Sequence, residues 1–196
     1  MANTTTSFLD EFVSAARGCF ALLVGNRQAS SYFDFRQTGL VGSFIALMIG
    51  LAVQAFGPQL LGHPSPKGIA SGLLILSALV LAVQFGAAWL VLRWMGRSDG
   101  FVPFIVAQNW VALFQSILAV AIIVFIGEPF VIAPGSEVAQ LTSASIPYIV
   151  LGIAALVVSV NIARLILTLR PRHVAAFVIA QLLTALFLQP ILAALV

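Results

Sequence analysis

Residues 101–126 read FVPFIVAQNWVALFQSILAVAIIVFI, an unbroken stretch without Asp, Glu, Lys or Arg. An α-helix rises about 1.5 Å per residue, so roughly 20 apolar residues cross the hydrocarbon of a bilayer. Four other stretches have the same character, and we predict spans at residues 39–56, 69–92, 101–126, 146–169 and 174–195. The expected fold class is an all-α integral membrane bundle of five transmembrane helices, a single membrane domain over residues 1–196.

The composition of the chain agrees with this class. Of the 196 residues, 61% are hydrophobic and 8% are charged, whereas a soluble domain carries roughly 25% charged residues. So few charged groups cannot cover a water-facing surface, and membrane lipids are the expected surroundings. The basic residues lie beside the spans, so we expect no nucleic-acid partner. Other membrane proteins or a homo-oligomer remain open as partners.

The basic residues fall almost entirely on one side of the membrane. Lys67 is the exception among the nine Lys and Arg residues. The other eight precede the first span, lie in loops of the same side, or lie toward that end of the fourth span: Arg17, Arg27, Arg36, Arg93, Arg97, Arg164, Arg170 and Arg172. Positive charge is retained in the cytoplasm during insertion. We therefore predict a multi-pass membrane protein with its N-terminus on the cytoplasmic side and its C-terminus on the opposite side.

The segment before the first span, residues 7–25, has a helical pattern but is too polar to cross a membrane. Ser7 and Asp10 resemble a capping box at its start. Apolar residues then recur with a helical period, while Asp10, Ser14 and Arg17 share the other side. We predict an N-terminal amphipathic interfacial helix. Packing of this helix against the spans is the alternative.

The loop between the third and fourth spans, residues 127–145, is rich in residues that interrupt regular structure. Pro129, Pro134 and Gly135 lie in it, and such residues mark turns and loops. We therefore expect no helix or strand in this loop.

Four amide side chains lie at one predicted depth in four different spans: Gln84, Asn109, Asn161 and Gln181. Counted from the arginine-rich end of each span, all four lie roughly 12–14 Å deep. An amide carries both donor and acceptor groups, so one interpretation is a polar layer whose hydrogen bonds hold the helices together. The alternative is a lining for a polar solute or a water path. The first interpretation is the one we favour, because no predicted span contains Asp or Glu.

Arg164 is the one charged residue well inside a predicted span. It lies six residues from Arg170, which corresponds to roughly 9 Å along a helix. Its long side chain can therefore reach the headgroups, as lysine and arginine do near the ends of spans. We predict an anion or lipid-headgroup contact at Arg164.

The chain shows no set of residues that would support catalysis. Its one cysteine, Cys19, excludes an intramolecular disulfide. His63 and His173 lie in loops of opposite sidedness, so they cannot bind one metal ion together. Hydrolase, zinc-protease, phosphate-loop and dinucleotide-binding motifs are absent from the sequence. We predict no catalytic residues, no metal and no cofactor, and a protein that is not an enzyme.

A short motif leads into the first span. Residues 33–44 read FDFRQTGLVGSF, and the first-span motif consists of Phe33, Asp34, Gly39, Ser43 and Phe44. It resembles the corresponding segment of small bacterial proteins related to the Yip (Rab/Ypt-interacting) family, in which a serine stands at Arg36 and an arginine at Gly42. The Ala107–Trp110 segment looks like a second family motif, which ends in Asn-Trp.

The resemblance implies a five-span fold with a cytoplasmic N-terminal segment. It also implies a bacterial inner (cytoplasmic) membrane, in which the expected C-terminus is periplasmic. Eukaryotic Yip-type proteins are membrane factors linked to small GTPases and vesicle traffic, although this chain has no GTPase-facing motif that we can identify. The expected function is that of a non-enzymatic, Yip-like membrane protein that organises membranes or associates with a complex. The alternative is a small polar-solute or ion transporter or channel that uses the amide layer.

Overall fold

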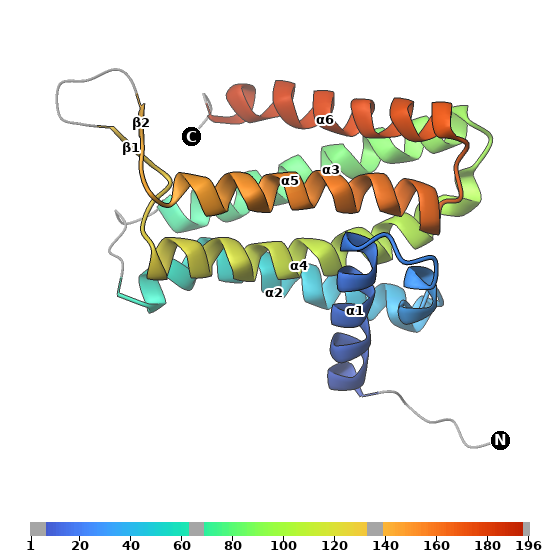
Figure 1. The fold of residues 1–196 in the computed structure, drawn as a ribbon, viewed down its shortest axis with the longest axis horizontal. Helices are drawn as coiled ribbons and strands as arrows, with labels where there is room; N and C mark the ends of the chain where they lie inside the picture. Colours follow the sequence, from blue (N-terminus) through green and yellow to red (C-terminus); the bar gives the residue numbers. More distant parts are fainter. Residues whose placement is uncertain (1–6, 63–68, 133–138, 194–196) are drawn as a thin grey trace.

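The computed structural model describes residues 7–62, 69–132 and 139–193. Six α-helices lie in these ranges (Figure 1): α1 (Phe8–Leu23), α2 (Gln37–Leu60), α3 (Ile69–Trp94), α4 (Phe101–Phe125), α5 (Ser145–Asn161) and α6 (Pro171–Ala193). Five of the helical segments are long and apolar enough to cross a membrane. The predicted fold class, an all-α bundle with five spans and an additional N-terminal helix, is confirmed.

The spans pack mainly in two pairs, α2 with α4 and α3 with α6, and α5 contacts both α4 and α6. Figure 1 shows the spans running along one direction, with α1 crossing that direction in front of α4. One end of the bundle carries the α3–α4 and α5–α6 turns, and we call it the arginine end after Arg93, Arg97, Arg170 and Arg172. We call the other end, which carries the hairpin between α4 and α5, the hairpin end.

Helix α1 begins with the predicted capping box. The Ser7 hydroxyl accepts a hydrogen bond from the amide of Leu9, and the Asp10 carboxylate accepts one from the amide of Ser7. The helix contacts α4 and α5 and buries small or apolar residues on one side: Ala15, Gly18, Ala21 and Leu22. Its other side exposes Leu9, Val13, Phe20 and Val24. Packing against the spans, the alternative for this segment, therefore occurs.

The loop between α4 and α5 contains regular structure, so the expectation of none was wrong. Strands β1 (Phe130–Ile132) and β2 (Ala139–Leu141) pair antiparallel, with Phe130 opposite Leu141. Pro129 lies just before β1, where its missing N–H removes no bond from the strand pair. Pro134 and Gly135 lie outside the described residues.

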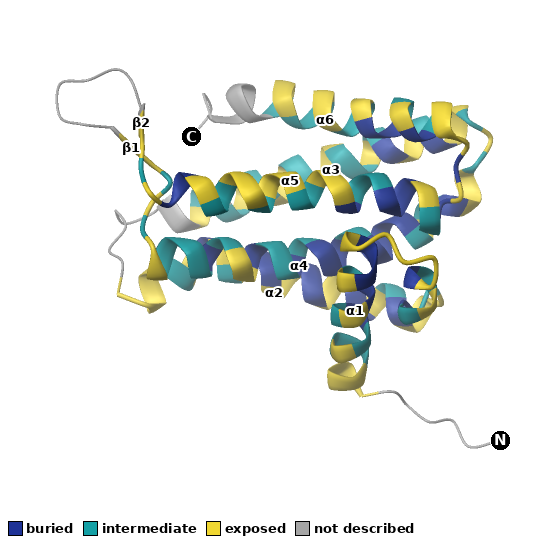
Figure 2. Cartoon of the chain, in the orientation of Figure 1, coloured by how far each residue is buried: buried dark blue, intermediate teal, exposed yellow. Residues whose placement is uncertain are grey.

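The last span before α6 ends differently from a plain α-helix. A π-helical segment, Ile162–Ile166, follows α5, and Thr168 has a positive φ of 48°. The Arg97 guanidinium donates hydrogen bonds to the Leu167 carbonyl (2.9 Å) and to the Thr168 hydroxyl (3.3 Å). Carbonyls at a helix C-terminus lack partners within the helix, so Arg97 satisfies one of them and fixes this turn to the α3–α4 turn. Buried and exposed residues alternate along α5 and α6 (Figure 2), which leaves one side of each helix outward.

Candidate functional site: a glutamine-lined cavity

Two adjoining cavities lie between the spans. The smaller, of about 250 Å³, is lined by residues of α3, α4, α5 and α6. The larger, of about 590 Å³, is lined by residues of α2, α3, α4 and α5. Their walls share Gln84, Gln108, Gln115, Gly152 and Ala155. We refer to the two together as the glutamine cavity.

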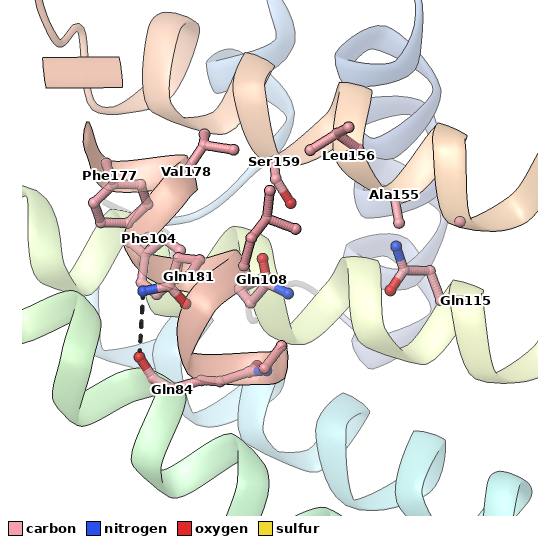
Figure 3. Close-up of a pocket in the computed structure, with 13 residues that line it drawn as sticks. Gln84, Phe104, Gln108, Gln115, Ala155, Leu156, Ser159, Phe177, Val178 and Gln181 are labelled. Atoms are coloured by element: carbon pink, nitrogen blue, oxygen red, sulfur yellow. Dashed lines mark hydrogen bonds between the residues drawn. The ribbon is translucent and has the colours of Figure 1, made fainter. Parts of the chain in front are cut away.

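Five glutamines from four helices line this cavity: Gln54 of α2, Gln84 of α3, Gln108 and Gln115 of α4, and Gln181 of α6. Figure 3 shows Gln84 and Gln181 beside each other, with Gln108 and Gln115 along the same side of α4. Ser77, Ser116, Tyr148 and Ser159 add hydroxyl groups. Among the described lining residues there is no Asp, Glu, Lys, Arg or His.

Most of the amide groups in this cavity have no protein partner. The Gln181 amide nitrogen donates one long hydrogen bond, 3.5 Å, to the backbone carbonyl of Gln84. Within the described part of the chain, the side chains of Gln54, Gln108 and Gln115 make no hydrogen bond. Each such amide offers two donors and an acceptor. The cavity therefore presents a cluster of free, uncharged hydrogen-bonding groups.

The four amides of the predicted layer do not lie in one network. Gln84 and Gln181 line the cavity. Asn109 is 0% exposed and faces α2, where its amide nitrogen donates to the Ser43 hydroxyl at 3.1 Å. Asn161 donates at 2.7 Å to the Leu22 carbonyl, near the end of α1. Two of the four thus line a cavity, and two hold neighbouring helices.

Three lining glutamines do not belong to the predicted layer: Gln54, Gln108 and Gln115. A helical signal connects two of them, because Gln108 and Gln115 are seven residues apart and so share a face of a helix. Ala112 and Ala119 lie on the same face and also line the cavity. Depth alone had grouped Asn109 with the other amides, whereas the direction of each side chain around its helix separates them.

Two phenylalanines line the smaller cavity on the side of the arginine end. They are Phe104 of α4 and Phe177 of α6. Their ring centroids are 5.3 Å apart and the rings are nearly perpendicular, at 83°. Phe85 of α3 meets Phe104 edge-on at 6.3 Å. The three rings form an apolar layer beside the amides, and Figure 3 shows Phe104 and Phe177 next to Gln181.

Arg164 lies in the π-helical segment and is exposed. It does not line the glutamine cavity. Within the described residues its guanidinium has no hydrogen bond and no salt bridge. The predicted anion or headgroup contact stays a prediction, and any such anion would bind outside the cavity.

Four of the five first-span motif residues meet where α1, α2 and α4 come together. Phe33 packs so close to Gly18 that a Cβ there would lie 2.7 Å from the ring. Gly39 leaves no space for a side chain, because a Cβ would lie 2.0 Å from the Asp34 carbonyl oxygen. Ser43 receives the Asn109 hydrogen bond. Phe44 differs from these four and is exposed.

The Asp34 carboxylate holds the start of α2. It accepts hydrogen bonds from the Arg36 guanidinium at 2.8 and 3.0 Å and from the Thr38 hydroxyl at 3.0 Å. The Arg36 hydrogen bond is the main cause that lowers the pKa of Asp34 to about 2. Glu11 of α1 lies nearby, and burial together with the charge of Asp34 raises its pKa. This junction is a structural one, and it lies away from the glutamine cavity.

No known family model, curated protein or solved structure matches this chain. The class is set by the fold and the composition, and the chain is a multi-pass integral membrane protein.

Proposed function

We propose that this protein binds small, uncharged polar solutes inside the membrane and lets them pass through the glutamine cavity. The observation that carries the proposal is the convergence of five glutamines on a cavity whose described lining residues carry no charge. The combined volume falls within the range of roughly 300–1,000 Å³ that is typical of small-molecule sites.

The chemistry of the lining favours a neutral solute. A polar group in hydrocarbon without a partner costs several kcal/mol, so the free amides of Gln54, Gln108 and Gln115 need water or a solute. Glutamine can donate to and accept from such a molecule. An ion that leaves water needs an opposite charge to offset the loss of hydration. The described lining residues offer no such charge, so an ion is disfavoured.

The positive charge of the arginine end supports a cytoplasmic position for that end of the bundle. Charge asymmetry of this kind accompanies insertion with the positive side inside. In this proposal the N-terminus is cytoplasmic, the C-terminus is periplasmic, and the bilayer is a bacterial inner membrane.

A second candidate function is the organisation of membranes or complexes by a Yip-like protein. Two observations favour it: the clustering of Phe33, Asp34, Gly39 and Ser43 at one junction, and the exposed apolar side of α1. In this proposal α1 contacts lipids or a partner membrane protein, and no reaction is catalysed. Purification in mild detergent tests it, because a stable co-purifying protein supports this candidate.

Passage of solutes is tested by filling the cavity. Gly152 lines both parts of the cavity, and a Cβ at this position would meet nothing within 4 Å. Gly152→Leu therefore places a side chain in the open space without a clash. In proteoliposomes, stopped-flow light scattering measures the entry of water, glycerol and urea. We expect the native protein to raise the rate of entry of at least one of these solutes, and Gly152→Leu to abolish that increase in rate.

The matched control is Gly86→Leu. Gly86 also has nothing within 4 Å, but it does not line the cavity. This variant should keep the native rate. Native proteoliposomes no faster than empty ones for all three solutes, or full activity of Gly152→Leu, would contradict the proposal.

A further inference from the structure

We propose that Phe104 and Phe177 form a gate that closes the glutamine cavity at the arginine end. The gate deepens the proposed function and rests on it, because a gate matters only if the cavity admits water or solute. In this proposal the structure is in a state in which the glutamine cavity is closed toward the arginine end.

The two rings are placed to seal this end. They come from α4 and α6, touch in a T-shaped arrangement at 5.3 Å, and are only 4% and 2% exposed. Phe85 of α3 packs against Phe104 in a second T-shaped arrangement. Apolar constrictions of this type stop water and polar solutes by excluding water from the narrow point.

The seal lies near the arginine end and is followed there by apolar side chains. Phe104 is three residues from the start of α4, which is about one helical turn. Toward the arginine end the core contains Leu92, Leu167 and Val174, all buried. The larger cavity extends the other way as far as Tyr148, in the first turn of α5. Among the described residues, the polar lining therefore stops at the rings and extends toward the hairpin end.

The arrangement of the helices allows this contact to open. Phe104 belongs to the α2–α4 pair and Phe177 to the α3–α6 pair, so their ring contact joins the two pairs. The π-helical segment after α5 contacts both α4 and α6. Such segments are frequent at functional sites because an irregular hydrogen-bond pattern can rearrange. A small shift between the pairs would separate the rings while each pair stays packed.

Cysteine labelling from each side of the membrane tests the gate. In a Cys19→Ser background, Gln108→Cys places a thiol in the cavity beyond the rings. Asp99→Cys, in the exposed α3–α4 turn, identifies the face that carries the arginine end. A membrane-impermeant maleimide is applied to right-side-out and to inverted vesicles. We expect Gln108→Cys to react from the hairpin side alone.

Removing a ring should change the sidedness. With Phe177→Ala or, separately, Phe104→Ala, Gln108→Cys should become reactive from the arginine side as well. Labelling from the hairpin side should persist in both variants and shows that they are folded. Phe187→Ala is the matched control, because Phe187 lies on the same helix but is 63% exposed and does not line the cavity. It should leave the sidedness unchanged.

The outcomes separate the gate from the proposed function. If Gln108→Cys reacts from neither side, the cavity holds no water, and both proposals are overturned. If it reacts from both sides while both rings are present, the gate is overturned and the solute cavity stands. The same holds if neither alanine variant reacts from the arginine side.

Discussion

Two faces of α4 show how the same chemistry serves different purposes within one helix. Gln108 and Asn109 are adjacent in sequence and both carry amides. Asn109 is fully buried against α2 and has a protein partner, Ser43. Gln108 faces the glutamine cavity and has none among the described residues. We call these two sides the α2 face and the cavity face of α4.

The difference comes from the distance between backbones. On the α2 face small residues let the two helices approach closely, and a Cβ at Gly50 would lie 2.9 Å from the Leu113 Cα. At that distance a short amide reaches a hydroxyl on the next helix. On the cavity face Gly152 of α5 has nothing within 4 Å of its Cβ direction. An amide in the membrane therefore holds helices together where backbones are close, and lines a cavity where they are not.

The largest expected effect compares leucine at the two glycines. Gly50→Leu pushes a side chain into the Leu113 backbone, which has no free rotation to relieve the clash. We expect a loss of about 3 kcal/mol or more in the free energy of unfolding. Gly152→Leu should change it by less than about 1 kcal/mol. Unfolding in mixed micelles with increasing SDS measures both, and equal losses would show that the two faces are packed alike.

The next effect compares the neighbouring amides. Asn109→Leu removes the hydrogen bond to Ser43 and should lower the free energy of unfolding by about 1–2 kcal/mol. Gln108→Leu removes no protein hydrogen bond, so the same SDS titration should show no loss of stability. It should instead slow solute entry into proteoliposomes. A stability loss in Gln108→Leu as large as that in Asn109→Leu would mean that the cavity face is also structural.

A third test asks whether this tight packing extends to α1. Asn161→Leu deletes the hydrogen bond to the Leu22 carbonyl, and we expect a loss of about 1 kcal/mol. Amide hydrogen exchange at Gly25 and Asn26, just after α1, should become faster. Ser159→Ala is the control, since Ser159 lies on the same helix and lines the cavity. Unchanged exchange in Asn161→Leu would mean that this bond does not hold the end of α1.

The smallest effect is a pH dependence at the junction on the α2 side. The Arg36 hydrogen bond lowers the pKa of Asp34 from 3.8 to about 2. A lowered pKa means that the ionised form is favoured in the folded protein, so this stabilisation is present above about pH 4 and is lost as the pH falls toward 2. The Arg36 side chain is exposed, so solvent screens this ion pair and the contribution should stay below about 1 kcal/mol. As the pH falls between these values, the melting temperature of Asp34→Asn should decline less than that of the native protein. An unchanged decline would mean that other groups cause the pH dependence.

The spans could be predicted from sequence because their signal is local. The stretch 101–126 became a helix over Phe101–Phe125, since apolar length alone decides whether a segment can cross a bilayer. The end of α5 could not be predicted in the same way. The π-helical segment and the positive φ of Thr168 lie beside the Leu167 carbonyl, which accepts a hydrogen bond from Arg97. Arg97 is 70 residues away in the sequence, so this contact leaves no local signal.

The candidate site was predicted only in part, for a related reason. Counting residues along each span gives the depth of an amide but not the direction in which it points. Gln84 and Gln181 share both depth and direction, whereas Asn109 and Asn161 share only the depth. The direction depends on which helices become neighbours, and that is a property of the assembled bundle.

The pairing of α3 with α6 has a consequence for biosynthesis. The ribosome releases α2 and α4 early, so their tight interface can form while the chain is still being made. Helix α3 can contact α2 early, but it gains its main partner only when α6 has been inserted. The wall that carries Gln84 and the ring of Phe177 are thus brought together only once α6 has been inserted.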